Sequence, residues 1–139
     1  MRALVFLLLV AAASAYQMDR CDLARQLQAA GMQYTGVSIA DWVCLAYRES
    51  TYRTDVVGPP NSDGSRDYGI FQVNNRYWCS GGGFNGQGCG VSCTDLFNLQ
   101  TSIACAKIIV RAQGISAWAG WVSGCQGRDL SEYISGCGV

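Results

Sequence analysis

The sequence predicts an α+β fold in which a helical lobe, built from both ends of the chain, packs beside a small β lobe built from the middle. Three observations in the 139 residues lead to this prediction. Hydrophobic side chains recur with helical spacing in both end regions. The middle is rich in glycine and turn-forming residues without that spacing, and eight cysteines can brace the whole. A groove between two such lobes is a natural place for a ligand.

The two N-terminal helices carry recognisable start signals. Asp19 can cap a first helix that runs to about Ala30. Ser38 and Asp41 have the spacing of a capping box, which predicts a second helix over residues 39–50. Both helices would belong to the helical lobe.

Shorter elements follow, separated by turn signals. Asn61–Ser65 has the composition of a turn, and alternating side chains predict a strand over Arg66–Asn74. The glycine-rich segment Ser80–Gly90 is expected to be a flexible loop, since it lacks the lysine and hydroxyl residue that end a phosphate-binding loop. Helical spacing returns over Thr101–Ala112, and a short helical turn is expected over Leu130–Ile134.

The first fifteen residues have the pattern of a secretory signal peptide. Arg2 gives a positive start, residues 4–10 are apolar, and Ala13–Ala15 is a small-residue cleavage site. The apolar run is well short of the ~20 residues that span a bilayer, which disfavours a membrane anchor. We therefore expect a signal peptide at 1–15 and one secreted, extracellular domain at 16–139, beginning at Tyr16.

The cysteine count fits that compartment. An even number of cysteines behind a signal peptide implies four disulfides. Zinc binding is the weaker reading, because the chain has no histidine and no pair of CxxC motifs. The count alone leaves roughly a hundred possible pairings.

The absence of histidine excludes whole classes of enzyme. It removes Ser-His-Asp and Cys-His nucleophiles and the common zinc hydrolases. Hydrolysis would therefore have to use carboxylates. Removing residues 1–15 takes away one basic residue, Arg2, and leaves nine basic against ten acidic residues, a formal net charge of −1. No basic stripe is present, so nucleic acid is not an expected partner.

Glu49 is the first candidate among those carboxylates. It continues the apolar face that Trp42, Leu45 and Ala46 form on the predicted helix. Burial and the negative end of the helix dipole would both raise its pKa, as a general acid working near neutral pH requires. The alternative is a structural ion pair with an arginine such as Arg48.

Asp67 is the natural partner because its surroundings are polar. It lies within the turn-rich run Asp63–Gly69, where Asn61, Ser65 and Asn74 could donate hydrogen bonds that hold it ionised. One carboxylate in an apolar setting and another in a polar one is the division that glycoside cleavage needs. The alternative is an aspartate that caps a turn.

Three segments resemble those of the C-type lysozymes. Trp42–Ser50 resembles the family's catalytic-glutamate helix, Asn61–Asn74 its signature hairpin, and Ala117–Trp121 its cleft wall. The resemblance covers residues 16–139 with all eight cysteines, and it implies a lysozyme-like fold with a helical lobe, a small antiparallel β lobe and a cleft between them. It also implies the disulfide pairs Cys21–Cys137, Cys44–Cys125, Cys79–Cys93 and Cys89–Cys105.

The resemblance further implies a lysozyme that cleaves β-1,4 bonds between N-acetylmuramic acid and N-acetylglucosamine in peptidoglycan with retention of configuration. This carboxylate division is the one attributed to lysozymes as a class, and it gives Glu49 the role of acid and Asp67 that of nucleophile or charge stabiliser. Such an enzyme would be bacteriolytic or digestive and monomeric, without a cofactor. The implied substrate-binding residues are Asn61, Asp63, Gln72, Asn74, Tyr77, Trp78, Ala117 and Trp118.

Several alternatives remain open at this level. Core packing competes equally with sugar binding for Trp78 and Trp118, and Trp42 and Trp121 are expected in the core. The protein could hydrolyse chitin oligosaccharides, or it could be a non-catalytic, lysozyme-like sugar-binding protein. No metal is expected. Calcium-binding relatives carry a cluster of aspartates between the equivalents of Cys93 and Cys105, whereas this chain has one carboxylate there, Asp95.

Overall fold

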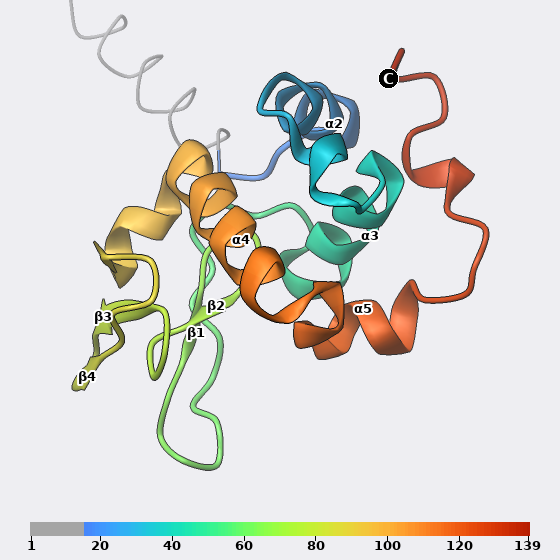
Figure 1. Ribbon diagram of the computed structural model, residues 1–139. Coiled ribbons are helices and arrows are strands. Elements are labelled where there is room, and N and C mark those ends of the chain that lie inside the picture. The colour runs from blue at the N-terminus through green and yellow to red at the C-terminus, as the bar shows by residue number, and fades with distance from the viewer. Residues whose placement is uncertain (1–15) are drawn as a thin grey trace, which may run out of the picture.

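The computed structural model describes residues 16–139 and has the predicted α+β architecture (Figure 1). The signal peptide expected at residues 1–15 lies outside this part of the chain. No helix among the described residues is long and apolar enough to cross a membrane.

The helices are α2 (Arg20–Ala29), α3 (Ile39–Ser50), α4 (Leu99–Gln113) and α5 (Ala119–Gly124), with 3-10 turns η1 (Met32–Thr35), η2 (Cys93–Phe97), η3 (Ile115–Ala117) and η4 (Ser131–Tyr133). The strands are β1 (Asp67–Tyr68), β2 (Val73–Asn74), β3 (Cys79–Gly81), β4 (Phe84–Asn85) and β5 (Val91–Ser92).

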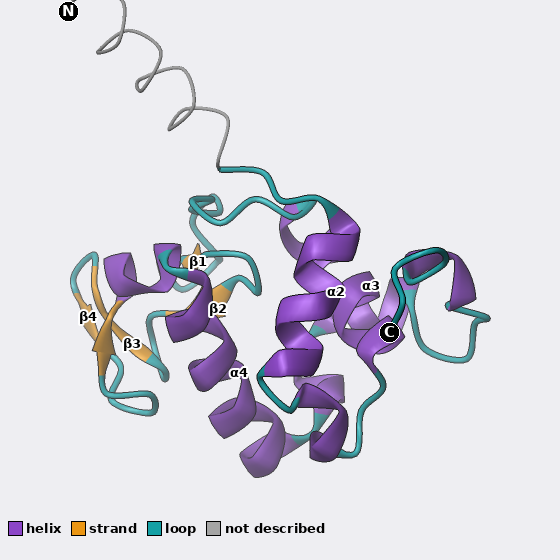
Figure 2. Ribbon diagram, turned by 90° about the horizontal axis from the view of Figure 1, so that it is seen from above, coloured by secondary structure: helices purple, strands orange, loops and turns teal. Residues whose placement is uncertain are grey.

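Both ends of the chain contribute to the helical lobe. The C-terminal segment lies beside α2 and α3, whereas the strands gather at the opposite side of α4 (Figures 1 and 2). Helix α4, the longest helix within residues 16–139, therefore runs between the two lobes. This arrangement confirms the predicted fold class of a helical lobe with a small β lobe.

Helix starts follow the capping signals in the sequence. The Asp19 carboxylate accepts from the backbone N–H of Cys21 at 3.0 Å, and Ser38 Oγ accepts from the N–H of Asp41 at 3.1 Å. The capping box expected at the second site is only half formed. The Asp41 carboxylate instead accepts from Ser38 Oγ at 2.6 Å and from Trp121 Nε1 at 2.9 Å, which ties α3 to α5.

The prediction of a single strand over Arg66–Asn74 is wrong, because the segment folds back on itself as a hairpin. β1 pairs antiparallel with β2, and the backbone turns between them, where Gly69 has φ +81° and Gln72 φ +51°. A β-carbon on Gly69 would come within 2.5 Å of the Leu96 carbonyl oxygen. The glycine is thus required both for the turn and for the contact with η2.

The other strands form a second small sheet in the order β4-β3-β5. β3 and β4 are antiparallel across a turn, whereas β3 and β5 are parallel. The segment expected to be a flexible loop therefore contains paired strands. Fully buried Asn75 holds this lobe together, since its side chain accepts from the Arg66 N–H and donates to the Gly81 carbonyl, both at 3.0 Å.

The core lies between the helices and reaches the hairpin turn. Trp42 is fully buried, and its ring meets those of Phe71 and Trp118 edge-on, with centroids 5.8 and 5.7 Å apart. Trp121 is only partly buried. Buried Ser50, at the end of α3, has its Oγ 2.8 Å from the Ile70 carbonyl oxygen. These contacts fix the hairpin against the last turn of α3.

Four disulfides join segments that are distant in sequence. One links the chain ends, one links α3 to the end of α5, and two hold the β lobe to η2 and α4. Crosslinks of this kind each stabilise a fold by about 2–4 kcal/mol. The bonded pairs are Cys21–Cys137, Cys44–Cys125, Cys79–Cys93 and Cys89–Cys105, the same pairs that the resemblance implies.

Candidate active site

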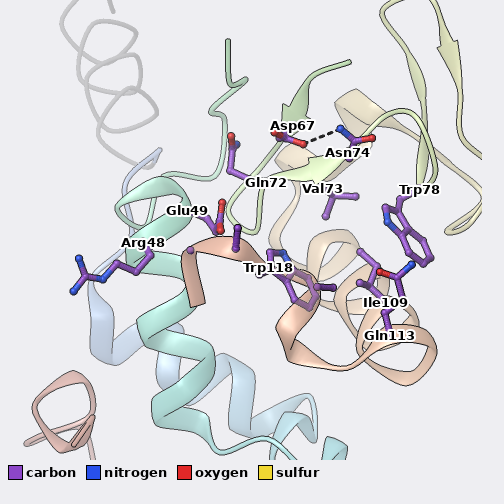
Figure 3. A pocket seen from close by; sticks show the side chains of 13 residues that line it. Arg48, Glu49, Asp67, Gln72, Val73, Asn74, Trp78, Ile109, Gln113 and Trp118 are labelled. Carbon is purple, nitrogen blue, oxygen red and sulfur yellow. Dashed lines mark hydrogen bonds between the residues drawn. The ribbon is translucent and has the colours of Figure 1, made fainter. Parts of the chain in front are cut away.

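A cavity of about 330 Å³ lies between the two lobes (Figure 3). Its walls come from the last turn of α3, from the β1–β2 hairpin, from one side of α4 and from the segment around η3 and α5. The lining residues are Arg48, Glu49, Asp67, Gln72, Val73, Asn74, Trp78, Ile109, Gln113, Ala117, Trp118, Ala119 and Gly120.

A second hollow, of about 420 Å³, continues the cavity along the β lobe. The two hollows form one elongated cleft because they share part of their lining. Every substrate-binding candidate from the sequence lines one or both of them. The shared residues are Asp67, Asn74, Trp78, Gln113 and Ala117, and the second hollow adds Asn61, Ser62, Asp63, Ser65 and Tyr77.

Glu49 lies in the last turn of α3 and points into the cavity (Figure 3). Burial raises the pKa of its carboxyl group above the ordinary value, a hydrogen bond from the Gly120 N–H lowers it, and the charge of Asp67 raises it again. The net direction is upward. Among the described residues no basic group lies within ion-pairing distance of Glu49, so the structure does not support the ion-pair alternative.

Asp67 begins β1 on the opposite wall and is held by two amides. Asn74 Nδ2 donates to one carboxylate oxygen at 3.0 Å, and Asn61 Nδ2 donates to the other at 3.3 Å. Asn74 is in position because it pairs with Asp67 across the hairpin. Ser65 does not bond to Asp67 directly. Its Oγ accepts hydrogen bonds from the amides of Asn74 at 3.0 Å and Asn61 at 3.1 Å, and so helps to orient them.

Asp63 has a structural task at the rim of the cleft. It accepts from the backbone N–H of Ser65 at 2.9 Å and from its Oγ at 2.5 Å, and these bonds lower the pKa of Asp63. It also meets the Arg76 guanidinium at 3.5 Å. Arg76 in turn lies over the ring of Tyr77, which is 63% exposed, so one face of that ring is partly covered.

The two candidate tryptophans differ in their settings. Trp118 is 6% exposed, and its indole N–H donates to the Phe71 carbonyl at 2.8 Å. It therefore forms an apolar wall and has no free donor for a sugar. Trp78 is partly buried, and its ring lies directly on the backbone at Gly88, where a β-carbon would collide with it. Its position in both hollows leaves it available for stacking on a sugar.

Gln72 lines the cavity, but its amide group holds the hairpin turn. Nε2 donates to the carbonyl oxygens of Val56 at 3.1 Å and Gly69 at 3.0 Å. Only its side-chain oxygen remains to accept from a ligand. Ala117 is exposed at the junction of the two hollows, where its backbone can reach a ligand.

Gln113, Gly120 and Arg48 are among the lining residues that were not anticipated as site residues from the sequence. Gln113 ends α4 and lies at the junction of the two hollows, Gly120 touches Glu49 from α5, and Arg48 lines the edge with its side chain directed away from the centre (Figure 3). No local signal marks them, because each reaches the site through the packing of one helix against another. Within residues 16–139, no three side chains of metal-binding type gather into a possible metal site.

Comparison with known proteins gives a consistent result over the whole domain. A sequence profile of the C-type lysozyme/alpha-lactalbumin family matches residues 16–137. The chain is 50% identical to Lysozyme C II of Oncorhynchus mykiss over 145 aligned positions, and 49% identical to Lysozyme C of Scophthalmus maximus over 144, with 100% of both chains covered in each case. It is 49% identical to Lysozyme C-1 of Mus musculus, with 96% of this chain and 94% of the relative covered. The chain therefore belongs to the C-type lysozyme/alpha-lactalbumin family.

Proposed function

We propose that the protein is a secreted glycosidase that cleaves the β-1,4 bonds between N-acetylmuramic acid and N-acetylglucosamine in peptidoglycan, with retention of configuration. The observation that carries the proposal is the pair of carboxyl groups facing one cleft. Burial raises the pKa of Glu49, while two amides hold Asp67 in place. Relatives about half identical over their full length carry the name lysozyme, which supports the same reading.

The chemistry divides between the two groups. Glu49, whose protonated form is favoured by burial, gives a proton to the glycosidic oxygen as the bond to the anomeric carbon breaks. The Asp67 carboxylate stabilises or bonds to the positive anomeric carbon on the other face of the ring. Water then attacks that carbon, breaking its bond to Asp67 where one has formed, and Glu49 takes a proton from the attacking water. The leaving group departs from the Glu49 face of the sugar ring, and water arrives on that same face. The configuration at the anomeric carbon is therefore retained.

The cleft supplies binding for several sugar rings. Trp78 offers an aromatic face for stacking, and Tyr77 extends it at the exposed rim. The Asn61 side-chain oxygen and the Ala117 backbone provide polar groups along the same line. We place Gln72, Asp63 and Asn74 among the supporting residues, because their polar groups are mainly engaged within the protein.

Secretion is part of the proposal, with residues 1–15 as the signal peptide. N-terminal sequencing of the protein from culture medium should begin at Tyr16. A secreted chain that retains Met1 would refute this processing site.

The central experiment is a peptidoglycan turbidity assay on the wild type, Glu49→Gln and Asp67→Asn. We expect each variant to lose at least about a hundredfold in rate, the contribution of a positioned acid or charged group. The control is Glu132→Gln, which changes the other glutamate, exposed in η4, and should keep full activity. Full activity in Glu49→Gln would remove the mechanism.

The wild-type result distinguishes the remaining functions. Hydrolysis of chitin oligosaccharides without lysis of peptidoglycan would indicate a chitin-oligomer hydrolase with the same chemistry. Binding without hydrolysis of either substrate would indicate a non-catalytic sugar-binding member of the family. NMR of the first product formed on an oligosaccharide should show retained anomeric configuration, and an inverted product would exclude Asp67 as nucleophile.

A further inference from the structure

One basic side chain borders the cleft. Among the described residues that line its two hollows, Arg48 is the only lysine or arginine, whereas Glu49, Asp63 and Asp67 line the same hollows with carboxyl groups. The ion pairs found within residues 16–139 do not involve Arg48, and its side chain is exposed to solvent. The border of the cleft therefore carries one positive charge that no carboxylate of these residues contacts.

Arg48 lies at one end of the cleft. It lines the first hollow but not the second, which extends past Trp78 along the β lobe. Figure 3 shows Glu49 between Arg48 and Trp78, with the Arg48 side chain directed away from the centre of the cavity. A chain of sugars that fills both hollows would therefore pass Glu49 and Asp67 and leave the cleft beside Arg48.

The outward direction of Arg48 follows from its position on α3. Consecutive residues of a helix lie about 100° apart around its axis, so Arg48 and Glu49 do not face each other. Glu49 points into the cavity, and Arg48 points out of it. The guanidinium is thus placed to meet a group outside the cavity rather than the sugar that Glu49 meets.

An aromatic cluster supports this guanidinium. The Cζ atom of Arg48 lies 5.9 Å from the centroid of the Tyr47 ring, which is within cation–π distance. Tyr47 is 42% exposed, and its ring packs against those of Tyr52 and Tyr133, with centroids 5.5 and 6.1 Å away. The mouth of the cleft therefore presents a guanidinium beside a partly exposed ring. Such a surface suits a short peptide that carries a carboxylate, because a guanidinium can donate two parallel hydrogen bonds to one.

Peptidoglycan carries peptides of this kind, and chitin does not. Stem peptides with free carboxylates are attached to the N-acetylmuramic acid units of peptidoglycan, whereas chitin is a neutral chain of N-acetylglucosamine. A stem peptide projects from the sugar chain, so on a strand bound in the cleft it would lie at the border rather than inside the cavity. The border is where Arg48 and Tyr47 are exposed.

We propose that Arg48, supported by Tyr47, binds a carboxylate of the peptidoglycan stem peptide and so makes the cleft favour peptidoglycan over chitin oligosaccharides. This inference rests on the proposed function, in which peptidoglycan occupies the cleft. It adds a feature of the substrate that the carboxyl pair does not read, since Glu49 and Asp67 act on a bond that both polymers share.

The preference can be measured by calorimetry on the Glu49→Gln protein, which should hold a ligand without cleaving it. One ligand is a tetrasaccharide of alternating N-acetylglucosamine and N-acetylmuramic acid whose stem peptides have free carboxylates. The other is the same compound with these carboxylates converted to amides. The acidic compound should bind about three- to tenfold more tightly at low salt, as expected for one charge-assisted contact that is partly exposed. Equal affinities would overturn the proposal.

The substitutions Arg48→Gln and Arg111→Gln, each added to Glu49→Gln, make a matched pair. Both remove one positive charge from an exposed arginine of a helix, but Arg111 lines neither hollow of the cleft. Arg48→Gln should abolish the preference for the acidic compound, and Arg111→Gln should keep it. A preference that survives Arg48→Gln, or that is lost equally in both proteins, would refute the contact. Equal loss of affinity for the acidic and the amidated compound in Arg48→Gln would also refute it, because the residue would then act on the sugars.

These outcomes are separable from those of the proposed function, because binding is measured without hydrolysis. If the wild type hydrolyses neither peptidoglycan nor chitin oligosaccharides, the affinities for the acidic and amidated compounds still decide whether Arg48 reads the stem peptide. If the wild type lyses peptidoglycan and the two compounds bind equally, the glycosidase remains and Arg48 has no role in recognition.

Discussion

Glu49, the acid of the proposed mechanism, is a single residue at which the burial that suits this role conflicts with the stability of the fold at high pH. Burial raises the pKa of its carboxyl group in the folded protein. The folded state therefore binds this proton more tightly than the unfolded chain. The contribution to stability is full at pH values below the unfolded pKa and is lost as pH rises through the raised folded pKa.

This conflict predicts the pH dependence of a Glu49→Gln variant. The neutral amide has nothing to ionise, so the variant should match the wild type near pH 3 and melt roughly 3 °C higher at pH 7. Thermal unfolding across this range, with Glu132→Gln as the exposed control, measures the difference. A difference that is constant with pH would contradict the assignment of Glu49 as the group whose ionisation is suppressed.

Asn74 provides a second prediction at the same scale. The hydrogen bond from the Asn74 amide to Asp67 is the shorter of the two that Asp67 accepts from amides, at 3.0 Å. The Asn74 backbone is held in place because it pairs with Asp67 in the hairpin. Asn74→Ala should lower kcat about tenfold with a smaller change in KM, because the carboxylate loses the orientation it needs in the transition state. Steady-state kinetics on an oligosaccharide test this, with Asn85→Ala in exposed β4 as control. A loss confined to KM would assign Asn74 to substrate binding alone.

At the level of the elements, local signals predicted the helices well and the strands poorly. The caps at Asp19 and Ser38 begin α2 and α3, because a cap uses only neighbouring residues. The continuous strand over Arg66–Asn74 was wrong, since its turn at Gly69 depends on a contact with η2. Helix α5 was not predicted: it has six residues, no side-chain cap, and packing against α3 as its main support.

Ser50 tests how the last turn of α3 is coupled to the hairpin. Its hydroxyl lies 2.8 Å from the Ile70 carbonyl oxygen and 3.0 Å from that of Ala46, and the residue is buried. Ser50→Ala leaves the Ile70 carbonyl without this donor and should reduce the free energy of unfolding by about 1–3 kcal/mol. Chemical denaturation measures the loss, and Ser116→Ala, exposed in η3, is the control. Equal stabilities would show that the hairpin is held by packing alone.

At the scale of the whole molecule, the site is assembled from segments that no local pattern connects. Glu49 comes from a helix, Asp67 from a hairpin, and Gly120 from a short helix far along the chain, and disulfides and the shared core bring them together. The carboxyl pair could be predicted from residue character together with the family resemblance. Gln113 and Gly120 could not, because their roles depend on how α4 and α5 pack.

The overall charge leads to the last prediction, which concerns the approach to a bacterial surface. With a formal net charge of −1 after removal of residues 1–15, the protein lacks the long-range attraction that steers a strongly basic protein to an anionic wall. Lysis should therefore change less than about twofold between about 20 and 150 mM salt, since there is little attraction to screen.

Replacing exposed Gln28, Tyr34 and Val122 with lysine adds three positive charges without altering the cleft. That variant should lyse cells faster at low salt and lose the gain as salt rises, while its rate on a neutral chitin oligosaccharide stays unchanged. If the wild type instead loses activity steeply with salt, local charges in the cleft rather than the net charge must govern binding.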